Sequence, residues 1–147
     1  MRDVRLLDRP FDPNAEIDPF ARAMGEAGAI ATFVGKVRPA GGVEALELSH
    51  YAPLTLPGME NLADSAMARW PLMGLLVLHR IGVLHPGEPI VMVACASAHR
   101  REAFEATDYL MDYLKSESWF WKREKIGGEW RWIEPRERDY ADRARWA

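Results

Sequence analysis

The stretch WFWKREKIGGEWRWIE, residues 119–134, decides the fold class. It places Gly127 and Gly128 between two segments in which aromatic or aliphatic residues alternate with charged ones. A two-residue turn with glycine typically joins antiparallel strands, because glycine adopts positive φ without strain. We therefore predict a β-hairpin here.

The residues that precede this hairpin predict the longest helix and a second hairpin. Between Arg101 and Ser118, apolar residues recur near helical spacing. Further upstream, LLVLHRIG (75–82) and PIVMVACASA (89–98) are strand-like and are separated by a Pro-Gly turn. We expect these two strands to pair.

The N-terminal half mixes shorter strands and helices. The predicted elements are a strand at Val4–Leu7, a short helix capped by Asp18 with Pro19 in its first turn, strands at 28–38 and 43–51 that pair as a hairpin, and a helix at 56–70 capped by Thr55. A short polar helix should cover 137–146. Because neighbouring strands are joined mostly by short turns and not by regular βαβ units, the prediction is an α+β fold with largely antiparallel sheet in one domain, 1–147.

Composition excludes several classes of protein. The net charge of -3 argues against a nucleic-acid-binding surface, and the longest apolar stretches are too short to span a membrane. The N-terminus lacks the apolar core of a secretory signal, and the single Cys95 lies in an apolar run where we expect a buried strand residue. Without a secretory signal or a membrane span, we expect a cytoplasmic protein. His50, His79 and His85 show no close metal-ligand spacing with Cys, Asp or Glu, so we expect no metal site, and we expect no cofactor.

Basic residues gather at the ends of predicted elements, where functional sites are commonly built. The clusters are Lys36 with Arg38, His99 with Arg100 and Arg101, Lys115, and Lys122 with Arg123. Taken alone, each is more often a solvated surface charge. Lys115 shares a helix face with Met111 and can either transfer protons at a cleft or simply favour the helix C-terminus. His99 begins the long helix, where it can bind a phosphate or be merely structural.

Five aromatic residues in and before the hairpin allow two interpretations. They are Trp119, Phe120, Trp121, Trp130 and Trp132. Packing on the core is the expected one, because one face of a two-stranded ribbon is normally buried. Stacking on a flat ring or a nucleic-acid base is the alternative.

Several strings, in this order and spacing, resemble the large subunit family of molybdopterin synthase: TFVGKVR, RWPL, HRIGVLHPGE, SAHRREAFEATDYLMDYLK, FWKRE and WIEPR. The resemblance covers about residues 28–137. It implies an α/β hammerhead fold with an additional largely antiparallel β subdomain. It also implies a sulfurtransferase that converts cyclic pyranopterin monophosphate to molybdopterin. The sulfur would come from the C-terminal Gly-Gly thiocarboxylate of a small ubiquitin-like partner subunit.

The same resemblance assigns roles to individual residues. Lys115 and Lys122 match the catalytic lysines; Arg38, His99, Arg100 and Arg136 match the anion-binding pocket; Phe33 and Met111 match residues that line it. It further implies a homodimer within a heterotetramer, with a residue borrowed across the dimer interface, and the projecting ribbon makes Arg136 the candidate. Two alternatives stay open, a non-catalytic adaptor for a ubiquitin-like tail and a single-strand nucleic-acid binder.

Overall fold

A computed structural model describes residues 1–117 and 119–146 of the chain. Its elements are β1 (Arg2–Leu7), α1 (Pro13–Ala23), β2 (Ala29–Lys36), β3 (Val43–His50), α2 (Ala52–Arg69), β4 (Leu72–Arg80), β5 (Gly82–Leu84), β6 (Pro89–Ser97), α3 (Arg100–Ser116), β7 (Phe120–Ile126), β8 (Glu129–Ile133) and α4 (Glu137–Ala144). Helices and mainly antiparallel strands alternate irregularly, so the predicted α+β class is confirmed.

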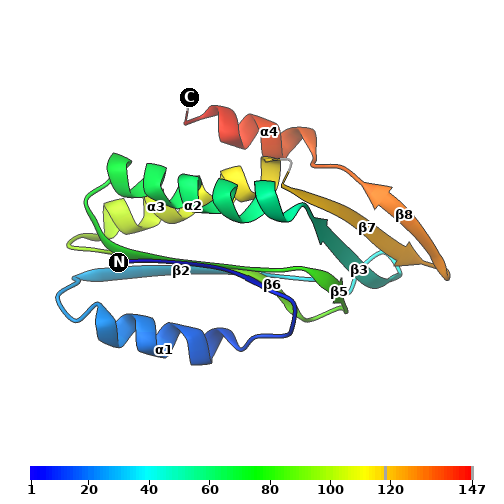
Figure 1. The fold of residues 1–147 in the computed structure, drawn as a ribbon, viewed down its shortest axis with the longest axis horizontal. Helices are drawn as coiled ribbons and strands as arrows, with labels where there is room; N and C mark the ends of the chain where they lie inside the picture. Colours follow the sequence, from blue (N-terminus) through cyan, green and yellow to red (C-terminus); the bar gives the residue numbers. More distant parts are fainter. Residues whose placement is uncertain (118, 147) are drawn as a thin grey trace.

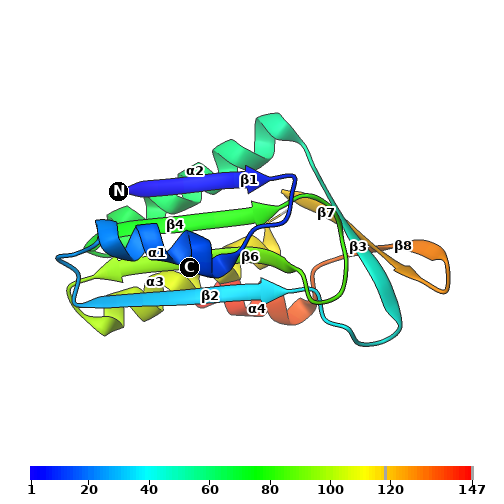
Figure 2. The ribbon, with the colours of Figure 1, turned by 90° about the horizontal axis from the view of Figure 1, so that it is seen from below.

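The first sheet has the strand order β1-β4-β6-β2, and only β1 and β4 run parallel. Helix α1 covers one face, while α2 and α3 cover the other (Figures 1 and 2). Successive side chains of a strand point to opposite faces. Leu75 and Val77 therefore pack with the α2–α3 layer, and Leu76 and Leu78 pack with α1. The predicted pairing of the strands at 75–82 and 89–98 is confirmed by the β4–β6 ladder.

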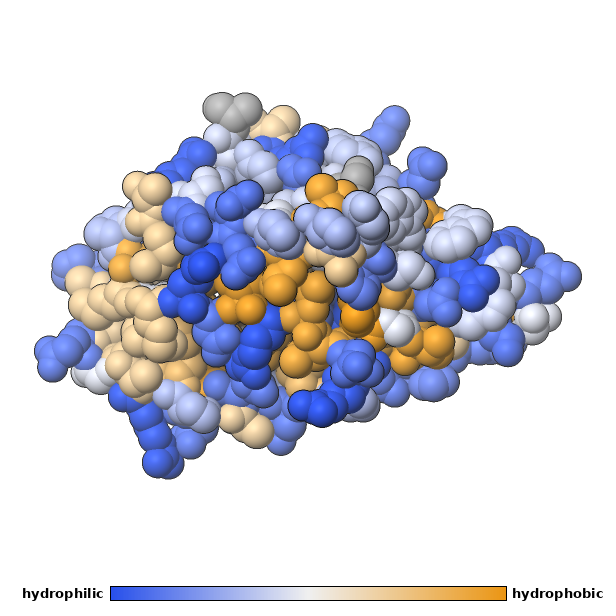
Figure 3. All heavy atoms as spheres, viewed as in Figure 1, coloured by the Kyte–Doolittle hydropathy of each residue, from blue (hydrophilic) through white to orange (hydrophobic). Residues whose placement is uncertain are grey.

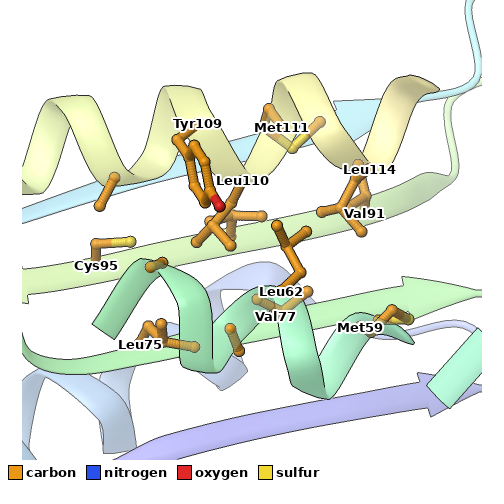
Figure 4. Close-up of a cluster of buried hydrophobic side chains, with 14 residues drawn as sticks. Met59, Leu62, Leu75, Val77, Val91, Cys95, Tyr109, Leu110, Met111 and Leu114 are labelled. Atoms are coloured by element: carbon orange, nitrogen blue, oxygen red, sulfur yellow. The ribbon is translucent and has the colours of Figure 1, made fainter. Parts of the chain in front are cut away.

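The main hydrophobic core lies between this sheet and the α2–α3 layer. Figure 4 shows Leu110 and Leu114 of α3 and Leu62 of α2 among the side chains of β4 and β6. Cys95 of β6 is fully buried in this cluster, as the sequence predicts. Burial raises the pKa of its thiol to about 11, so Cys95 is not a thiolate nucleophile near neutral pH.

The second sheet, with the order β5-β3-β7-β8, is entirely antiparallel and extends beyond one end of the first (Figure 1). Its outer hairpin confirms the Gly-Gly prediction. Gly127 and Gly128 have φ values of 58° and 81°, the positive pair that a two-residue type I′ turn requires. The projecting tip of this hairpin is covered mainly by hydrophilic residues (Figure 3).

The predicted hairpin between the strands at 28–38 and 43–51 is wrong. β2 pairs with β6, whereas β3 pairs with β5 and β7, so the connection at 39–42 leads from one sheet to the other. β6 is buried on both faces and needs a hydrogen-bonding partner along each edge, which β2 and β4 provide.

Two helices begin earlier than predicted. α1 starts at Pro13 because the Asp12 carboxylate accepts a hydrogen bond from the Asn14 amide at 2.9 Å, and Pro19 lies inside the helix. α2 starts at Ala52, and Thr55 does not cap it: the Thr55 hydroxyl is buried and donates to the carbonyl of Trp119 at 2.7 Å. α3 matches its prediction, although the predicted end at Ser118 lies outside the described residues.

The aromatic ribbon packs on the core only in part. Trp119 and Phe120 contact the main core, whereas Trp121 and Trp132 are 47% and 65% exposed. The Arg123 guanidinium lies 4.6 Å from the Trp130 ring centroid and 5.6 Å from that of Trp132. These tryptophans therefore form an outer face of the second sheet. No helix within 1–117 and 119–146 has both the length and the apolar character needed to cross a membrane.

Candidate active site

A cavity of about 830 Å³ lies where the two sheets meet the end of α3 and the start of α4. Its cationic side chains are Lys36, Arg38, Lys115, Lys122 and Arg136, and its carboxylates are Glu124, Glu134 and Asp139. Small-molecule sites typically enclose about 300–1,000 Å³. With five cations against three carboxylates, the cavity has the size and sign to hold a small anion.

Lys115 reaches the cavity from the last turn of α3. Leu114 and Met111 of the same helix are buried, and they fix the rotation of its C-terminal turns. The macrodipole favours a positive charge at this position, but that contribution is modest for an exposed side chain. The main consequence is positional, since the helix end directs an exposed ammonium group to the cavity.

Lys122 reaches the cavity from β7. Strand alternation places Lys122, Glu124 and Ile126 on the cavity side, and Trp121 and Arg123 on the opposite one. Burial is the main cause that lowers the pKa of Lys122 to about 8; the nearby charges of Lys115 and Arg136 contribute to this shift, while Asp139 opposes it. An amine with this pKa can accept and release a proton near neutral pH.

Arg38 follows a segment that is held by backbone hydrogen bonds. The Val37 amide donates to the Glu88 carbonyl at 3.0 Å, and the Gly87 amide donates to the Val37 carbonyl at 2.8 Å. The Glu88 carboxylate in turn accepts from the buried Arg80 guanidinium at 3.1 Å. The turn before β6 thus fixes the backbone next to Arg38 at the cavity rim.

Arg136 is the N-cap residue of α4 and lines the same cavity as Lys115 and Lys122 of its own chain. Its backbone amide donates to the Asp139 carboxylate at 3.1 Å. Arg136 thus reaches the cavity that holds both lysines of its own chain, and the expectation that a neighbouring chain borrows it stays a prediction.

Phe33 and Met111 both line a groove next to the cavity, but only Phe33 also lines the cavity itself. Phe33 of β2 lines the cavity and also an adjoining apolar groove of about 410 Å³ between β2 and α3. Met111 lines only this groove. The groove continues the cavity along the edge strand, where Phe33 separates the two.

His99 and Arg100 lie away from the cavity of their own chain. Both are exposed at the N-terminal end of α3, and neither is among the residues that line the cavity. Lys115 is at the opposite end of this helix, roughly 24 Å away at the rise of an α-helix. One chain therefore does not unite all the cations that the sequence groups together.

Comparison with known proteins identifies the family. The family model described as "MoaE protein" matches residues 6–117. The chain is 49% identical to the molybdopterin synthase catalytic subunit of Caulobacter vibrioides over 97% of this chain and 96% of that protein, and 45% identical to the Escherichia coli one over 94% and 93%. The chain belongs to the MoaE family. Its fold matches that of the molybdopterin biosynthesis MoaE protein from Burkholderia ambifaria, with a TM-score of 0.85 and 41% identity over 99% and 98% of the two chains. The family resemblance, the fold and the enzyme class predicted from the sequence are thereby confirmed.

The relatives named above are catalytic subunits of molybdopterin synthase, so the cavity of this chain is a candidate active site. Sequence reasoning missed the three carboxylates of the cavity and one buried histidine next to it. The carboxylates are Glu124, Glu134 and Asp139, which look like ordinary surface charges in the sequence. Within the described part of the chain, no group of three or more His, Cys, Asp or Glu residues is placed to hold a metal ion.

His79 is the buried histidine that sequence reasoning missed. It is 4% exposed, and its ring stacks on Phe120 at 3.9 Å between centroids and 16° between planes. Its Nδ1 lies 2.8 Å from the Arg80 carbonyl, which can only accept, so Nδ1 carries the proton. Burial is the main cause that lowers the pKa of His79 to about 3; the hydrogen bond to the Arg80 carbonyl opposes this shift, and the charges of Lys122 and Lys115 contribute to it. His79 is thus a neutral ring close to the two lysines.

Proposed function

We propose that this MoaE-family chain converts cyclic pyranopterin monophosphate to molybdopterin at the described cavity. The sulfur donor would be the C-terminal thiocarboxylate of a small ubiquitin-like partner subunit, and the two proteins would act in the cytoplasm as a heterotetramer built on a homodimer of residues 1–147. The observation that carries the proposal is the convergence of Lys115, Lys122, Arg38 and Arg136 on one cavity.

The charges of the reactants explain why this cavity suits the reaction. A phosphate-bearing substrate and a thiocarboxylate are both anions, so they repel each other unless cations lie between them. Arg38 and Arg136, which both line the cavity, would bind the phosphate and the carboxylate that remains after transfer, since a guanidinium matches both groups with paired hydrogen bonds. Lys115 and Lys122 would hold the thiocarboxylate while its sulfur attacks the pterin side chain.

The two lysines would have different tasks. Because its pKa is about 8, Lys122 is mostly protonated at neutral pH but still has a neutral fraction that accepts a proton. Lys115 is exposed at the cavity mouth and would meet the incoming tail first. Holding the reacting atoms in line contributes more to the rate than any single ion pair.

A sulfur-transfer assay tests this proposal. Purified chain, thiocarboxylated partner and cyclic pyranopterin monophosphate are expected to give dithiolene product, and a partner that lacks its terminal Gly-Gly should give none. Cys95→Ala is the matched control: it should retain transfer, because sulfur arrives on the partner and the buried thiol does not line the cavity. Binding of the partner without product would instead identify a non-catalytic adaptor.

The proposed homodimer is supported by the position of His99 and Arg100, which lie at the end of α3 that is far from the cavity of their own chain. If these residues bind substrate as the family resemblance implies, they must do so at the cavity of a second chain. The edge strand β2 and α3 expose Ile30, Phe33 and Phe104, and such apolar groups beside an unpaired strand edge favour contact with another protein surface.

Mixing two inactive variants tests the shared site. Arg100→Ala and Lys115→Ala chains, each poorly active alone, are expected to regain up to about one quarter of wild-type activity after subunit exchange, because half of the dimers are mixed and one of their two sites is intact. Arg136→Ala mixed with Lys115→Ala is the control and should show no recovery, since both residues line one cavity. Recovery in the control alone would assign the shared residue to Arg136.

A further inference from the structure

The part of the cavity wall that α4 provides is held only in part by the helix itself. All residues of α4 are described and none is buried, yet Arg136 at its start and Asp139 in its first turn line the cavity. A helix of eight residues has little stability of its own. Within α4, Arg143 contacts Glu117 and the Tyr113 ring of α3, and the other polar contacts that fasten this part of the chain to α3 lie beyond the helix.

These contacts form a C-terminal clasp, which we define as Arg145 and Trp146 with Asp108 and Asp112 of α3 and Arg69 of α2. The Asp112 carboxylate accepts from the Arg145 guanidinium at 2.5 Å and from the Trp146 indole N–H at 2.6 Å. Asp108 accepts a further hydrogen bond from Arg145 at 3.0 Å. The Asp112 side chain is only 12% exposed, so solvent screens these charged contacts less than ordinary surface pairs.

Trp146 also packs among aromatic rings of the two long helices. Its ring lies 5.7 Å from Trp70 and 5.6 Å from Tyr109, both edge to face. Arg69 lies over the same ring at 5.5 Å and donates to the Trp146 carbonyl at 2.9 Å. Because Tyr109 belongs to the main core, the clasp fastens Arg145 and Trp146 to the core that α2 and α3 form with the first sheet.

The clasp and the cavity lie at opposite ends of α4. Figure 1 shows α4 lying along the α2–α3 layer, with the chain terminus at its far end. Arg143 near that end contacts the Glu117 carboxylate at 3.2 Å. Asp112 is three residues before Lys115, so a single helix, α3, carries a catalytic candidate and the main acceptor of the clasp.

We propose that the C-terminal clasp positions Arg136 and Asp139 at the cavity, which makes Asp112 and Trp146 positioning residues for the reaction. The effect on the reaction rests on the proposed function of Arg136. The effect on α4 does not, because it follows from the contacts alone.

Two measurements on the full complex test this proposal. In Asp112→Asn and Trp146→Ala, amide hydrogen exchange at residues 136–142 is expected to accelerate at least tenfold, while exchange in the middle of α3 stays unchanged. In both variants the KM for the phosphate-bearing substrate should rise about tenfold, with a smaller change in kcat. Trp146→Phe, which keeps an aromatic ring, should have a KM close to that of the wild type. Asp142→Asn is the matched control, since it removes a carboxylate from α4 that is not part of the clasp.

The outcomes separate the proposal from the function on which it partly rests. Unchanged exchange at 136–142 in Asp112→Asn would overturn the clasp, whatever the activity. Accelerated exchange with an unchanged KM would overturn its role in the reaction. Arg136→Ala is measured alongside: a normal KM there would refute the substrate-binding role of Arg136, while the exchange data would still decide whether the clasp holds α4.

Discussion

Lys115→Ala is expected to lower the rate of dithiolene formation by at least about 100-fold while leaving the fold intact. Lys115 is exposed at the end of α3, and within the described residues it makes no ion pair, so its removal costs little stability. Its ammonium group, in contrast, is directed at the cavity where the anions must meet. Single-turnover product formation with thiocarboxylated partner measures the effect, and circular dichroism verifies folding.

Lys125→Ala is the control for this prediction. Lys125 lies on β7 between cavity residues Glu124 and Ile126 in sequence but does not line the cavity. The variant removes the same charge from the chain and should keep near-normal turnover. A folded Lys115→Ala protein as active as Lys125→Ala would refute the catalytic role of Lys115.

Lys122→Met is expected to lose activity by a similar factor and, unlike Lys115→Ala, to become more stable. The pKa of Lys122 is about 8 in the folded protein against 10.5 for the free side chain, so unfolding takes up protons between these values. The charged amine therefore destabilises the fold at neutral pH, and stability of the wild type rises as pH increases from about 8 toward 10.5. Each pKa unit corresponds to about 1.4 kcal/mol. The free energy of unfolding of Lys122→Met is therefore expected to exceed that of the wild type by on the order of 1–3 kcal/mol at pH 7.

Urea unfolding of both proteins at several pH values measures this gain. The difference between Lys122→Met and wild type should be largest below pH 8 and should shrink as the pH approaches 10.5. Lys125→Met should show no such pH-dependent gain. A Lys122→Met protein that is less stable than wild type at pH 7 would mean that the lysine is not held at a desolvation cost.

Local signals in the sequence were sufficient for most elements. The Gly127-Gly128 turn predicts its hairpin because a type I′ turn needs two residues at positive φ. The apolar spacing of α3 places Met111 and Lys115 correctly on one helix, because both features depend on residues a few positions apart. The predicted start of α1 was wrong because local signals can be ambiguous. Asp12-Pro13 and Asp18-Pro19 both have the N-cap and first-turn proline of a helix start, and only Asp12-Pro13 begins α1.

The sequence by itself determined the family and the α+β class, and it singled out Lys115 and Lys122 as candidates, because these follow from short motifs and from periodicity along the chain. Only the tertiary structure decided that β2 pairs with β6, that Arg136 joins Lys115 and Lys122 in one cavity while His99 and Arg100 do not, and that Trp146 contacts Asp112 of α3. It also decided the lowered pKa of Lys122, which depends on burial and on charges from α3 and α4. Each of these properties arises between segments far apart in the sequence, so no local pattern encodes them.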